Sequence, residues 1–290
     1  MEKYKVVIIG AGIAGMSAAI NLKRAGISPL IIENNAPGGT LNYIPNIENY
    51  PGYESISGPD LAMNIYNQVN NLDIKMKSLN ISNIDLDKKI INNDIEFEYL
   101  IIATGRKNRT LNLHNEKELL GRGISTCALC DGMFYKDKDV IVVGGGNSAL
   151  TESLYLSNIC KKVTIIIRRD NFTGDKYLVD RVSNKKNIKV INNSNIISYN
   201  TKNNILVSVT LDNKKMVKTS GVFLALGGIP NSKLFNVEKE NDYILVNNKY
   251  ETNIPYVYAI GDVIKKDYYQ LTTAVSDAVI ASNNIIRINK

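Results

Sequence analysis

One local pattern, a strand, a glycine-rich turn, a helix and a second strand, occurs twice in this chain and constrains its fold more than any other feature. The first turn is Gly10–Gly15 and the second is Gly144–Ala149, about 134 residues later. In each copy one crossover helix joins two apolar strands, which implies that the strands are parallel. The period is far longer than that of a solenoid. We therefore predict an α/β fold with two Rossmann-like, three-layer dinucleotide-binding domains.

The first turn reads Gly10-Ala11-Gly12-Ile13-Ala14-Gly15 and has the full G-x-G-x-x-G spacing. The first glycine permits the tight turn, the second lets a pyrophosphate approach the backbone, and the third lets helix and strand pack closely. The helix N-terminus offers free N–H groups and a partial positive charge to the phosphates. Glu33 ends the second strand, where its carboxylate can accept both hydroxyls of a ribose. These residues predict an adenine-dinucleotide site, and the alternative is a plain glycine-rich turn.

The second turn, Gly144-Gly145-Gly146-Asn147-Ser148-Ala149, is a G-x-G-x-x-A variant in the same setting. Counting 18 residues from the end of each turn reaches Glu33 in the first copy and Ile167 in the second. Arg168 and Arg169 follow Ile167 directly. A carboxylate there would favour NAD, whereas arginines accommodate a 2′-phosphate, whose geometry suits the guanidinium fork. The second site is therefore predicted to take NADPH, with a solvated strand end as the alternative for the two arginines.

Two of the three cysteines form a C-x-x-C pair, Cys127 and Cys130, which Asp131 follows. A structural zinc site would need two further ligands at metal spacing, and the chain offers only His114 and Cys160. We therefore predict no metal site and interpret the pair as a redox dithiol, with inert thiols as the alternative. Asp131 is a candidate proton donor or acceptor, or otherwise a helix N-cap. Cys160 is expected to be a small, half-buried side chain near a helix end.

Other elements are expected from local signals. A helix should begin near residue 59 with Ser57 as its cap, and another should cover about 272–286. Polar residues from 106 to 122 are interpreted as a linker. Strands are expected at 221–226 and 256–260.

The formal charge is +7 and the sequence pI is about 9.1, but the lysines are scattered and form no long block. We therefore expect no nucleic-acid binding, whereas an acidic protein partner stays open. No apolar run approaches the roughly 20 residues of a membrane span, and we expect no targeting segment at the start of the chain. The expected protein has no membrane association and is cytoplasmic.

Taken together, these residues resemble the low-molecular-weight thioredoxin reductases, a group of flavoprotein pyridine nucleotide-disulfide oxidoreductases. The likeness covers nearly the whole chain in order, and a C-x-x-C-D-G placed between two dinucleotide motifs is highly specific. It runs through Gly10–Gly15, Gly38-Gly39-Thr40-Leu41, Glu48-Asn49-Tyr50-Pro51-Gly52, Ala103-Thr104-Gly105, Cys127–Gly132, Gly144–Ala149, Ile167-Arg168-Arg169-Asp170, Gly261-Asp262 and Gln270.

The resemblance implies a split FAD domain, with residues 1–110 and 229–290 as its two parts, and an inserted NAD(P)H domain, residues 111–228, that carries the C-x-x-C. It implies an NADPH-dependent, FAD-containing thioredoxin-disulfide reductase that acts on thioredoxin or a thioredoxin-like protein and forms a homodimer. By position, Cys130 matches the cysteine that faces the flavin and Cys127 the one that attacks thioredoxin. Asp131 matches the acid–base residue.

The resemblance and the turns together give the candidate cofactor contacts. The FAD set is Gly10, Gly12, Ala14, Gly15, Glu33, Gly39, Thr40, Leu41, Asn49, Ala103, Thr104, Gly105, Gly261, Asp262, Gln270 and Leu271. The NADPH set is Gly144, Gly146, Asn147, Ser148, Ala149, Arg168 and Arg169.

The sequence departs from the family pattern near the electron donor. The usual H-R-R-x-x-x-R has Ile167 for its histidine and Thr173 for its last arginine, and Tyr269 replaces the arginine usually found before Gln270. Residues 274–278 lack the usual glycines. An alternative is therefore the same reductase fed by ferredoxin or NADH. A further alternative, a non-catalytic flavin-binding redox sensor, conflicts with the retained cysteine pair.

Overall fold

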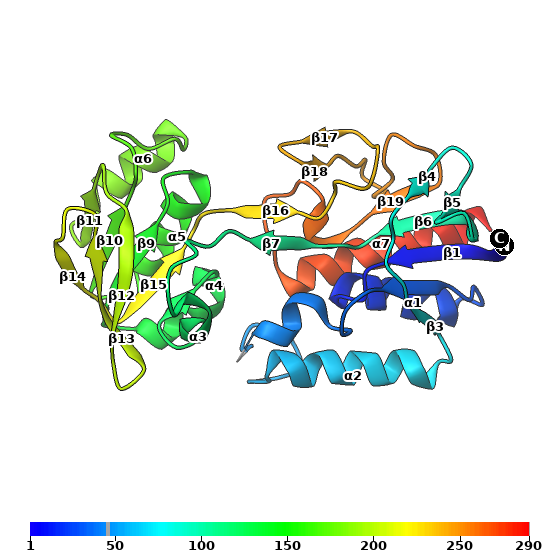
Figure 1. Ribbon diagram of the computed structural model, residues 1–290, viewed down its shortest axis with the longest axis horizontal. Coiled ribbons are helices and arrows are strands. Elements are labelled where there is room, and N and C mark those ends of the chain that lie inside the picture. The colour runs from blue at the N-terminus through cyan, green and yellow to red at the C-terminus, as the bar shows by residue number, and fades with distance from the viewer. Residues whose placement is uncertain (45–46, 290) are drawn as a thin grey trace. The chain divides into compact units, whose positions relative to one another are not determined.

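The computed structural model describes residues 1–44 and 47–289. The chain divides into two compact units, the first made of Met1–Lys107 with Ile229–Lys290 and the second of Asn108–Gly228. The chain therefore leaves the first unit, completes the second and returns. The two crossings are the short strands β7 (Arg106–Asn108) and β16 (Gly228–Pro230), which pair with each other (Figure 1).

The first unit is built on a seven-stranded sheet of order β3-β2-β1-β6-β5-β4, in which β19 also pairs with β6. Strands β3, β2, β1, β6 and β19 run parallel to one another. Strand β5 pairs antiparallel with both β6 and β4. Their bounds are β1 Glu2–Ile9, β2 Leu30–Glu33, β3 Lys75–Ser78, β4 Ile84–Asp85, β5 Ile90–Ile91, β6 Ile95–Ile102 and β19 Val257–Ala259. A separate pair, β17 (Lys239–Glu240) and β18 (Tyr243–Ile244), is antiparallel.

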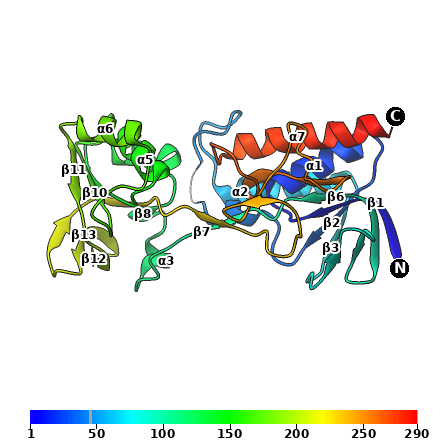
Figure 2. The ribbon, with the colours of Figure 1, turned by 90° about the horizontal axis from the view of Figure 1, so that it is seen from above.

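Side chains on β1 alternate between the two faces of this sheet, as a strand requires. Val6 and Ile8 join the core under the helices, whereas Val7 and Ile9 join the core on the opposite face. The helices are α1 Ile13–Arg24, α2 Gly58–Asn71 and α7 Leu271–Ile288, with the short 3₁₀ turns η1 Gly39–Tyr43 and η3 Gly261–Val263. Figure 2 shows α1 and α7 side by side on one face of the sheet. The last residues of the chain thus cover the first glycine turn's own helix.

The second unit has three layers around a parallel sheet of order β11-β10-β9-β15-β8. Helices pack on one face, and an antiparallel three-stranded sheet packs on the other. The strands are β8 Ile124–Ser125, β9 Asp139–Val143, β10 Lys162–Ile166, β11 Ile188–Ile191, β12 Ile196–Lys202, β13 Ile205–Leu211, β14 Met216–Lys218 and β15 Gly221–Leu224; the helices are α3 Glu116–Leu119, α4 Ala128–Asp131, α5 Asn147–Ser157 and α6 Lys176–Ser183, and a 3₁₀ turn, η2, covers Gly132–Tyr135. The predicted α/β class with two Rossmann-like domains is confirmed.

Local predictions were mostly confirmed. Ser57 caps α2, since its side chain accepts a hydrogen bond from the Asp60 N–H. The interpretation of 106–122 as a plain linker was wrong, because this stretch contains β7 and α3. Glu116 helps to fix the structure of this stretch, because its buried carboxylate accepts hydrogen bonds from the Leu111 N–H at 3.0 Å and the Tyr199 hydroxyl at 2.7 Å.

None of the helices in the described part of the chain has the length and apolar composition that crossing a membrane requires.

Candidate functional site: an open dinucleotide turn and a disulfide

In the first glycine turn, Gly10 and Gly15 pack tightly against other backbone atoms, whereas Gly12 has free space beside it. Gly10 has a φ of +107°, and a Cβ there would overlap the carbonyl oxygen of Ala103. A Cβ on Gly15 would overlap the carbonyl oxygen of Gly10. A Cβ on Gly12, in contrast, would meet no atom within 4 Å. Gly12 is also the N-cap of α1 without any side-chain cap, so the backbone here can receive a phosphate.

Glu33 lies at the end of β2 and is fixed by the backbone around the turn. Its carboxylate accepts hydrogen bonds from the Ala11 N–H at 2.8 Å and the Asn35 N–H at 2.9 Å. The 3₁₀ turn η1 is joined to the same place, because the Gly38 N–H donates to the Ala11 carbonyl at 2.8 Å. A Cβ on Gly39 would lie 3.3 Å from the Cα of Gly12. The predicted contacts before residue 45 therefore gather around one turn, which fits a dinucleotide.

Several of the remaining candidates of the first unit follow β6 and β19. Thr104 is held by reciprocal hydrogen bonds with Asn231: its hydroxyl donates to the Asn231 carbonyl at 2.7 Å, and the Asn231 amide donates back at 2.9 Å. The Asn49 amide donates to the Gln270 side-chain oxygen at 3.1 Å. Gln270 forms a capping box with Thr273 at the start of α7. The other predicted positions differ in exposure. Ala103 and Leu41 are buried and Thr40 is exposed, while a Cβ on Gly105 would meet no atom within 4 Å. Ala14 lies against Gly261, and Leu271 is the first residue of α7.

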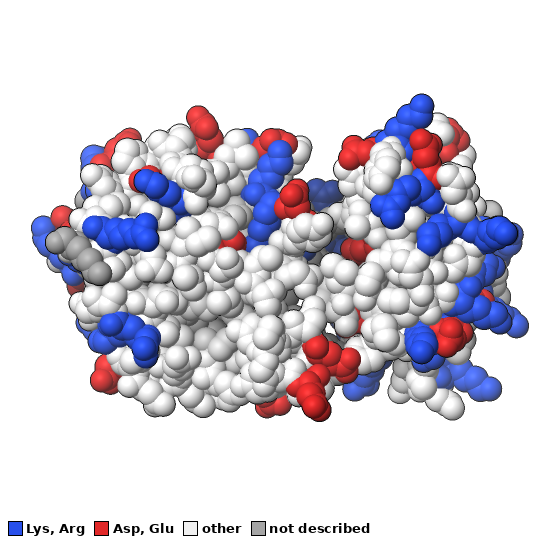
Figure 3. All heavy atoms as spheres, turned by 180° about the vertical axis from the view of Figure 1, so that it is seen from behind, with Lys and Arg blue, Asp and Glu red and all other residues white. Residues whose placement is uncertain are grey.

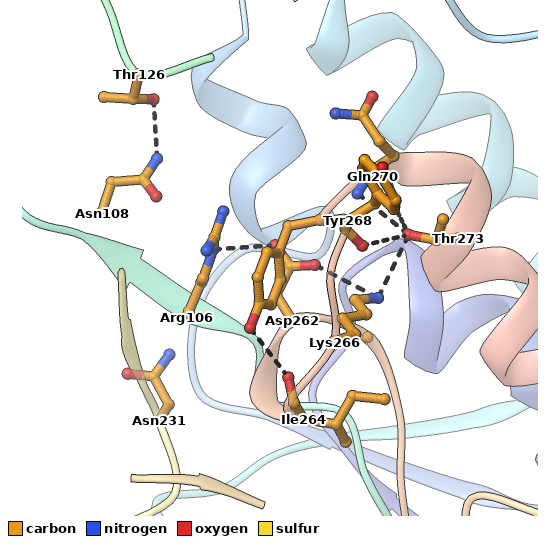
Figure 4. A network of polar contacts seen from close by, with 12 residues as sticks. Arg106, Asn108, Thr126, Asn231, Asp262, Ile264, Lys266, Tyr268, Gln270 and Thr273 are labelled. Atoms are coloured by element: carbon orange, nitrogen blue, oxygen red, sulfur yellow. Dashed lines mark hydrogen bonds and ion pairs between the residues drawn. The ribbon is translucent and has the colours of Figure 1, made fainter. Parts of the chain in front are cut away.

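Asp262 belongs to a chain of four alternating charges, Arg106, Asp262, Lys266 and Asp277, which the sequence motifs do not indicate. Figure 4 shows its carboxylate between Arg106 on one side and Lys266 on the other, at 3.5 Å and 3.9 Å. Lys266 in turn pairs at 2.8 Å with Asp277, which is buried in α7 and accepts the Gly261 N–H at 3.0 Å. Burial raises the pKa of Asp262, and the nearby Arg106 and Lys266 oppose that shift. The chain of charges thus fixes the Gly261–Asp262 turn.

The buried Lys266–Asp277 pair gives a stability prediction. Removing one partner leaves the other charge buried alone, so Asp277→Ala should lower the free energy of unfolding of the first unit by about 3–5 kcal/mol. The matched control is the neighbouring Lys265, which pairs with Glu240 at the surface. Lys265→Ala should cost less than about 1 kcal/mol. Urea unfolding followed by circular dichroism measures the free energy of unfolding of both variants. Equal small losses would show that the buried pair stabilises the unit no more than the surface pair does.

The second glycine turn is bordered by its own neighbouring loop. A Cβ on Gly145 would lie 3.3 Å from the Ile167 side chain, and the Thr173 N–H donates to the Gly145 carbonyl at 2.8 Å. Asn147 and Asp175 exchange hydrogen bonds of 2.9 Å and 2.7 Å at the start of α5. Gly144 and Gly146 are half-buried, Ser148 is exposed, and Ala149 is buried next to Gly144.

The two arginines and the isoleucine of the second site differ in exposure. Ile167 is only 3% exposed and belongs to the core under α5. Arg168 and Arg169 are exposed just beyond β10. In the described ranges neither forms an ion pair with a carboxylate. Their guanidinium groups are therefore available to an anionic ligand.

Cys127 and Cys130 form a disulfide in the second unit, with their Cα atoms 5.3 Å apart. Both are half-buried, and Cys127 is the N-cap of α4, where its sulfur accepts the Cys130 N–H at 3.2 Å. Asp131 ends α4 and occupies the N-cap position of η2, as its alternative interpretation expected, although its side chain makes no cap hydrogen bond there. Cys160 is 5% exposed, and burial raises its pKa to about 11. The reactive sulfurs are therefore those of the disulfide.

Comparisons with known proteins agree with this site. Residues 4–278 match the model of the family described as pyridine nucleotide-disulphide oxidoreductase. The chain is 37% identical to the thioredoxin reductase of Rickettsia prowazekii, over 99% of this chain and 98% of the relative.

Two solved structures are similar to this chain in fold. The thioredoxin reductase of Streptococcus pyogenes is 36% identical with a TM-score of 0.91, covering 98% of this chain and 97% of that one. A ferredoxin-flavin thioredoxin reductase of Clostridium acetobutylicum is 28% identical with a TM-score of 0.53, covering 100% and 99%. The disulfide between two glycine turns, together with these likenesses, places the chain among the thioredoxin reductases of the pyridine nucleotide-disulphide oxidoreductase family.

Proposed function

We propose that this protein is a thioredoxin-disulfide reductase that passes electrons from NADPH, through FAD and the Cys127–Cys130 disulfide, to thioredoxin. The observation that carries the proposal is the disulfide itself, half-buried and followed by Asp131, in a chain whose other unit has a glycine turn open at Gly12. Thioredoxin reductases of this family use FAD and NADPH, and both turns suit dinucleotides.

The first unit would hold FAD through the turn at Gly10–Gly15, Glu33, Asp262 and Gln270. Bound FAD supplies a carrier that accepts two electrons from a nicotinamide and delivers them to a disulfide. The protein residues orient it: the open backbone at Gly12 suits the pyrophosphate, and the Glu33 carboxylate has a place beside the ribose.

On the side of this protein, disulfide exchange involves Cys127, Cys130 and Asp131. Two electrons and two protons convert the Cys127–Cys130 disulfide into two thiols. We assign the attack on the thioredoxin disulfide to the Cys127 thiolate, which gives a mixed disulfide, and its resolution to Cys130, which releases reduced thioredoxin and restores the internal disulfide. Asp131 donates and accepts the proton that the departing and attacking sulfurs exchange.

A protein substrate also fits the surface beside the disulfide. Leu129, Met133 and Phe134 are exposed within a few residues of the two cysteines. Exposed apolar side chains gathered in this way are typical of a protein contact. We propose thioredoxin or a thioredoxin-like protein as that partner, a homodimeric assembly and a cytoplasmic location, as the family resemblance implies.

The experiment that tests the function is a coupled assay with purified protein, FAD, NADPH and oxidised thioredoxin. We expect NADPH to be consumed in proportion to the thioredoxin thiols that appear. Cys160→Ser serves as the control and should leave the rate unchanged, because that thiol is buried and is not part of the disulfide. NADPH consumption without new thioredoxin thiols would contradict the proposal.

The preference for NADPH rests on Arg168 and Arg169, and it gives a second test. Losing a charge-assisted contact to the 2′-phosphate costs roughly 1.5–3 kcal/mol, or about a 10- to 150-fold change in binding. Arg168→Ala should raise the KM for NADPH within that range and hardly alter that for NADH. Arg181→Ala, on α6, is the control. Thr173→Arg should tighten NADPH binding, and an unchanged KM for Arg168→Ala would contradict the assigned contact.

Charge favours a second candidate, a thioredoxin reductase fed by ferredoxin. Residues 108–228 contain 18 Lys and Arg against 10 Asp and Glu, whereas the rest of the chain contains 17 against 18. Figure 3 shows many of these basic side chains over the second unit. A basic surface suits an acidic protein donor. Rapid flavin reduction by reduced ferredoxin, with slow reduction by both NADPH and NADH, would favour this candidate.

A further inference from the structure

Arg106 stands out in the first unit because its position is fixed and most of its hydrogen-bond donors are not used. Its side chain is only 20% exposed. The guanidinium carbon lies 3.8 Å from the centre of the Tyr269 ring, and Nε lies 3.5 Å from the Asp262 carboxylate. A guanidinium carries five N–H donors. In the described part of the chain no other hydrogen bond or ion pair of this group is present.

The surroundings of Arg106 point to the missing acceptor. Its chain neighbour Gly105 has open space around its Cα, with no atom within 4 Å of a Cβ there. Its stacking partner Tyr269 directly precedes Gln270, and its ion-pair partner is Asp262. Gly105, Asp262 and Gln270 are three of the residues proposed above to contact FAD. Arg106 is therefore joined to each of them, by the chain, by an ion pair or through Tyr269, although neither the glycine turns nor the cysteine pair indicated it.

We propose that Arg106 is a binding residue of the flavin site, whose unused N–H groups donate to oxygen atoms of bound FAD. Tyr269 and Asp262 are positioning residues: the ring stacks under the guanidinium, and the carboxylate fixes its in-plane direction. This inference rests on the proposed function, since it requires that the first unit binds FAD.

The test measures the affinity of the flavin-free protein for FAD, by the fluorescence change of the flavin on titration. Arg106→Gln should weaken binding by about 10- to 150-fold, the effect of losing a charge-assisted hydrogen bond. Arg106→Lys keeps the charge but loses the planar fork, so its affinity for FAD should lie between that of the original protein and that of Arg106→Gln. Tyr269→Phe keeps the stacking ring and should bind FAD like the original protein, whereas Tyr269→Leu should bind less tightly.

Control measurements separate this role from a structural one. Lys107→Gln, one residue further along β7 and exposed, should leave FAD affinity unchanged. Moving the charge with the double variant Arg106→Leu, Tyr269→Arg should recover part of the affinity lost in Arg106→Leu alone. Thermal unfolding of each flavin-free variant checks the fold. If the original protein binds FAD and folded Arg106→Gln binds it equally well, the inference is wrong; if the original protein binds no FAD, the proposed function fails instead.

Discussion

Replacing Cys130 with serine should abolish the reduction of thioredoxin and leave the flavin reducible by the electron donor. The internal disulfide cannot form without Cys130, so electrons that reach the flavin have no route to a protein disulfide. Cys127→Ser should give the same result by removing the attacking thiolate. Anaerobic spectra of the flavin and a thioredoxin thiol assay measure the two half-reactions separately.

The control for this pair is Cys160→Ser. That thiol is buried, and its raised pKa keeps it protonated at neutral pH, so its replacement should preserve both half-reactions. Normal thioredoxin reduction by Cys130→Ser would show that the dithiol mechanism is wrong.

The second large effect is expected at the first glycine turn, where two alanine substitutions should fail differently. In Gly15→Ala the new Cβ overlaps the Gly10 carbonyl oxygen, so helix α1 cannot pack on β1 and the first unit should not fold. In Gly12→Ala the new Cβ meets no atom within 4 Å. That variant should fold normally yet lose FAD, because the methyl group occupies the place at which a pyrophosphate approaches the backbone.

Circular dichroism and the flavin spectrum of the purified variants separate these outcomes. We expect native secondary structure without flavin for Gly12→Ala, and little folded protein for Gly15→Ala. A yellow, fully active Gly12→Ala protein would contradict the assignment of this turn to the flavin pyrophosphate.

The sequence was sufficient for the parts of the fold that follow from local chemistry. The two glycine turns required close approaches that only a strand–turn–helix unit makes, and the Cys127–Cys130 spacing suited a disulfide. Glu33 could be placed because it ends an apolar strand at a fixed distance from its turn. These features depend on residues that are near one another in the chain.

Some contacts that the sequence did not reveal join residues far apart in the chain. Arg106 meets Asp262 only because the chain returns into the first unit, whereas Lys266 and Asp277 lie in the same returning segment as Asp262. The signals were present but weak: a basic residue directly after Gly105, and an acid in α7 where the family usually has glycines. Similarly, the burial of Glu116 could not be predicted from the polar sequence of 106–122, because it depends on a hydrogen bond from Tyr199 in a distant strand.

The transfer of electrons from the flavin to thioredoxin can be followed by rapid anaerobic mixing of the NADPH-reduced protein with oxidised thioredoxin, with the flavin absorbance as the signal. We expect the flavin to be reoxidised as thioredoxin thiols appear in equal electron equivalents, and the flavin of Cys130→Ser to stay reduced after mixing. A flavin that NADPH reduces but thioredoxin does not reoxidise in the original protein would contradict the proposed transfer.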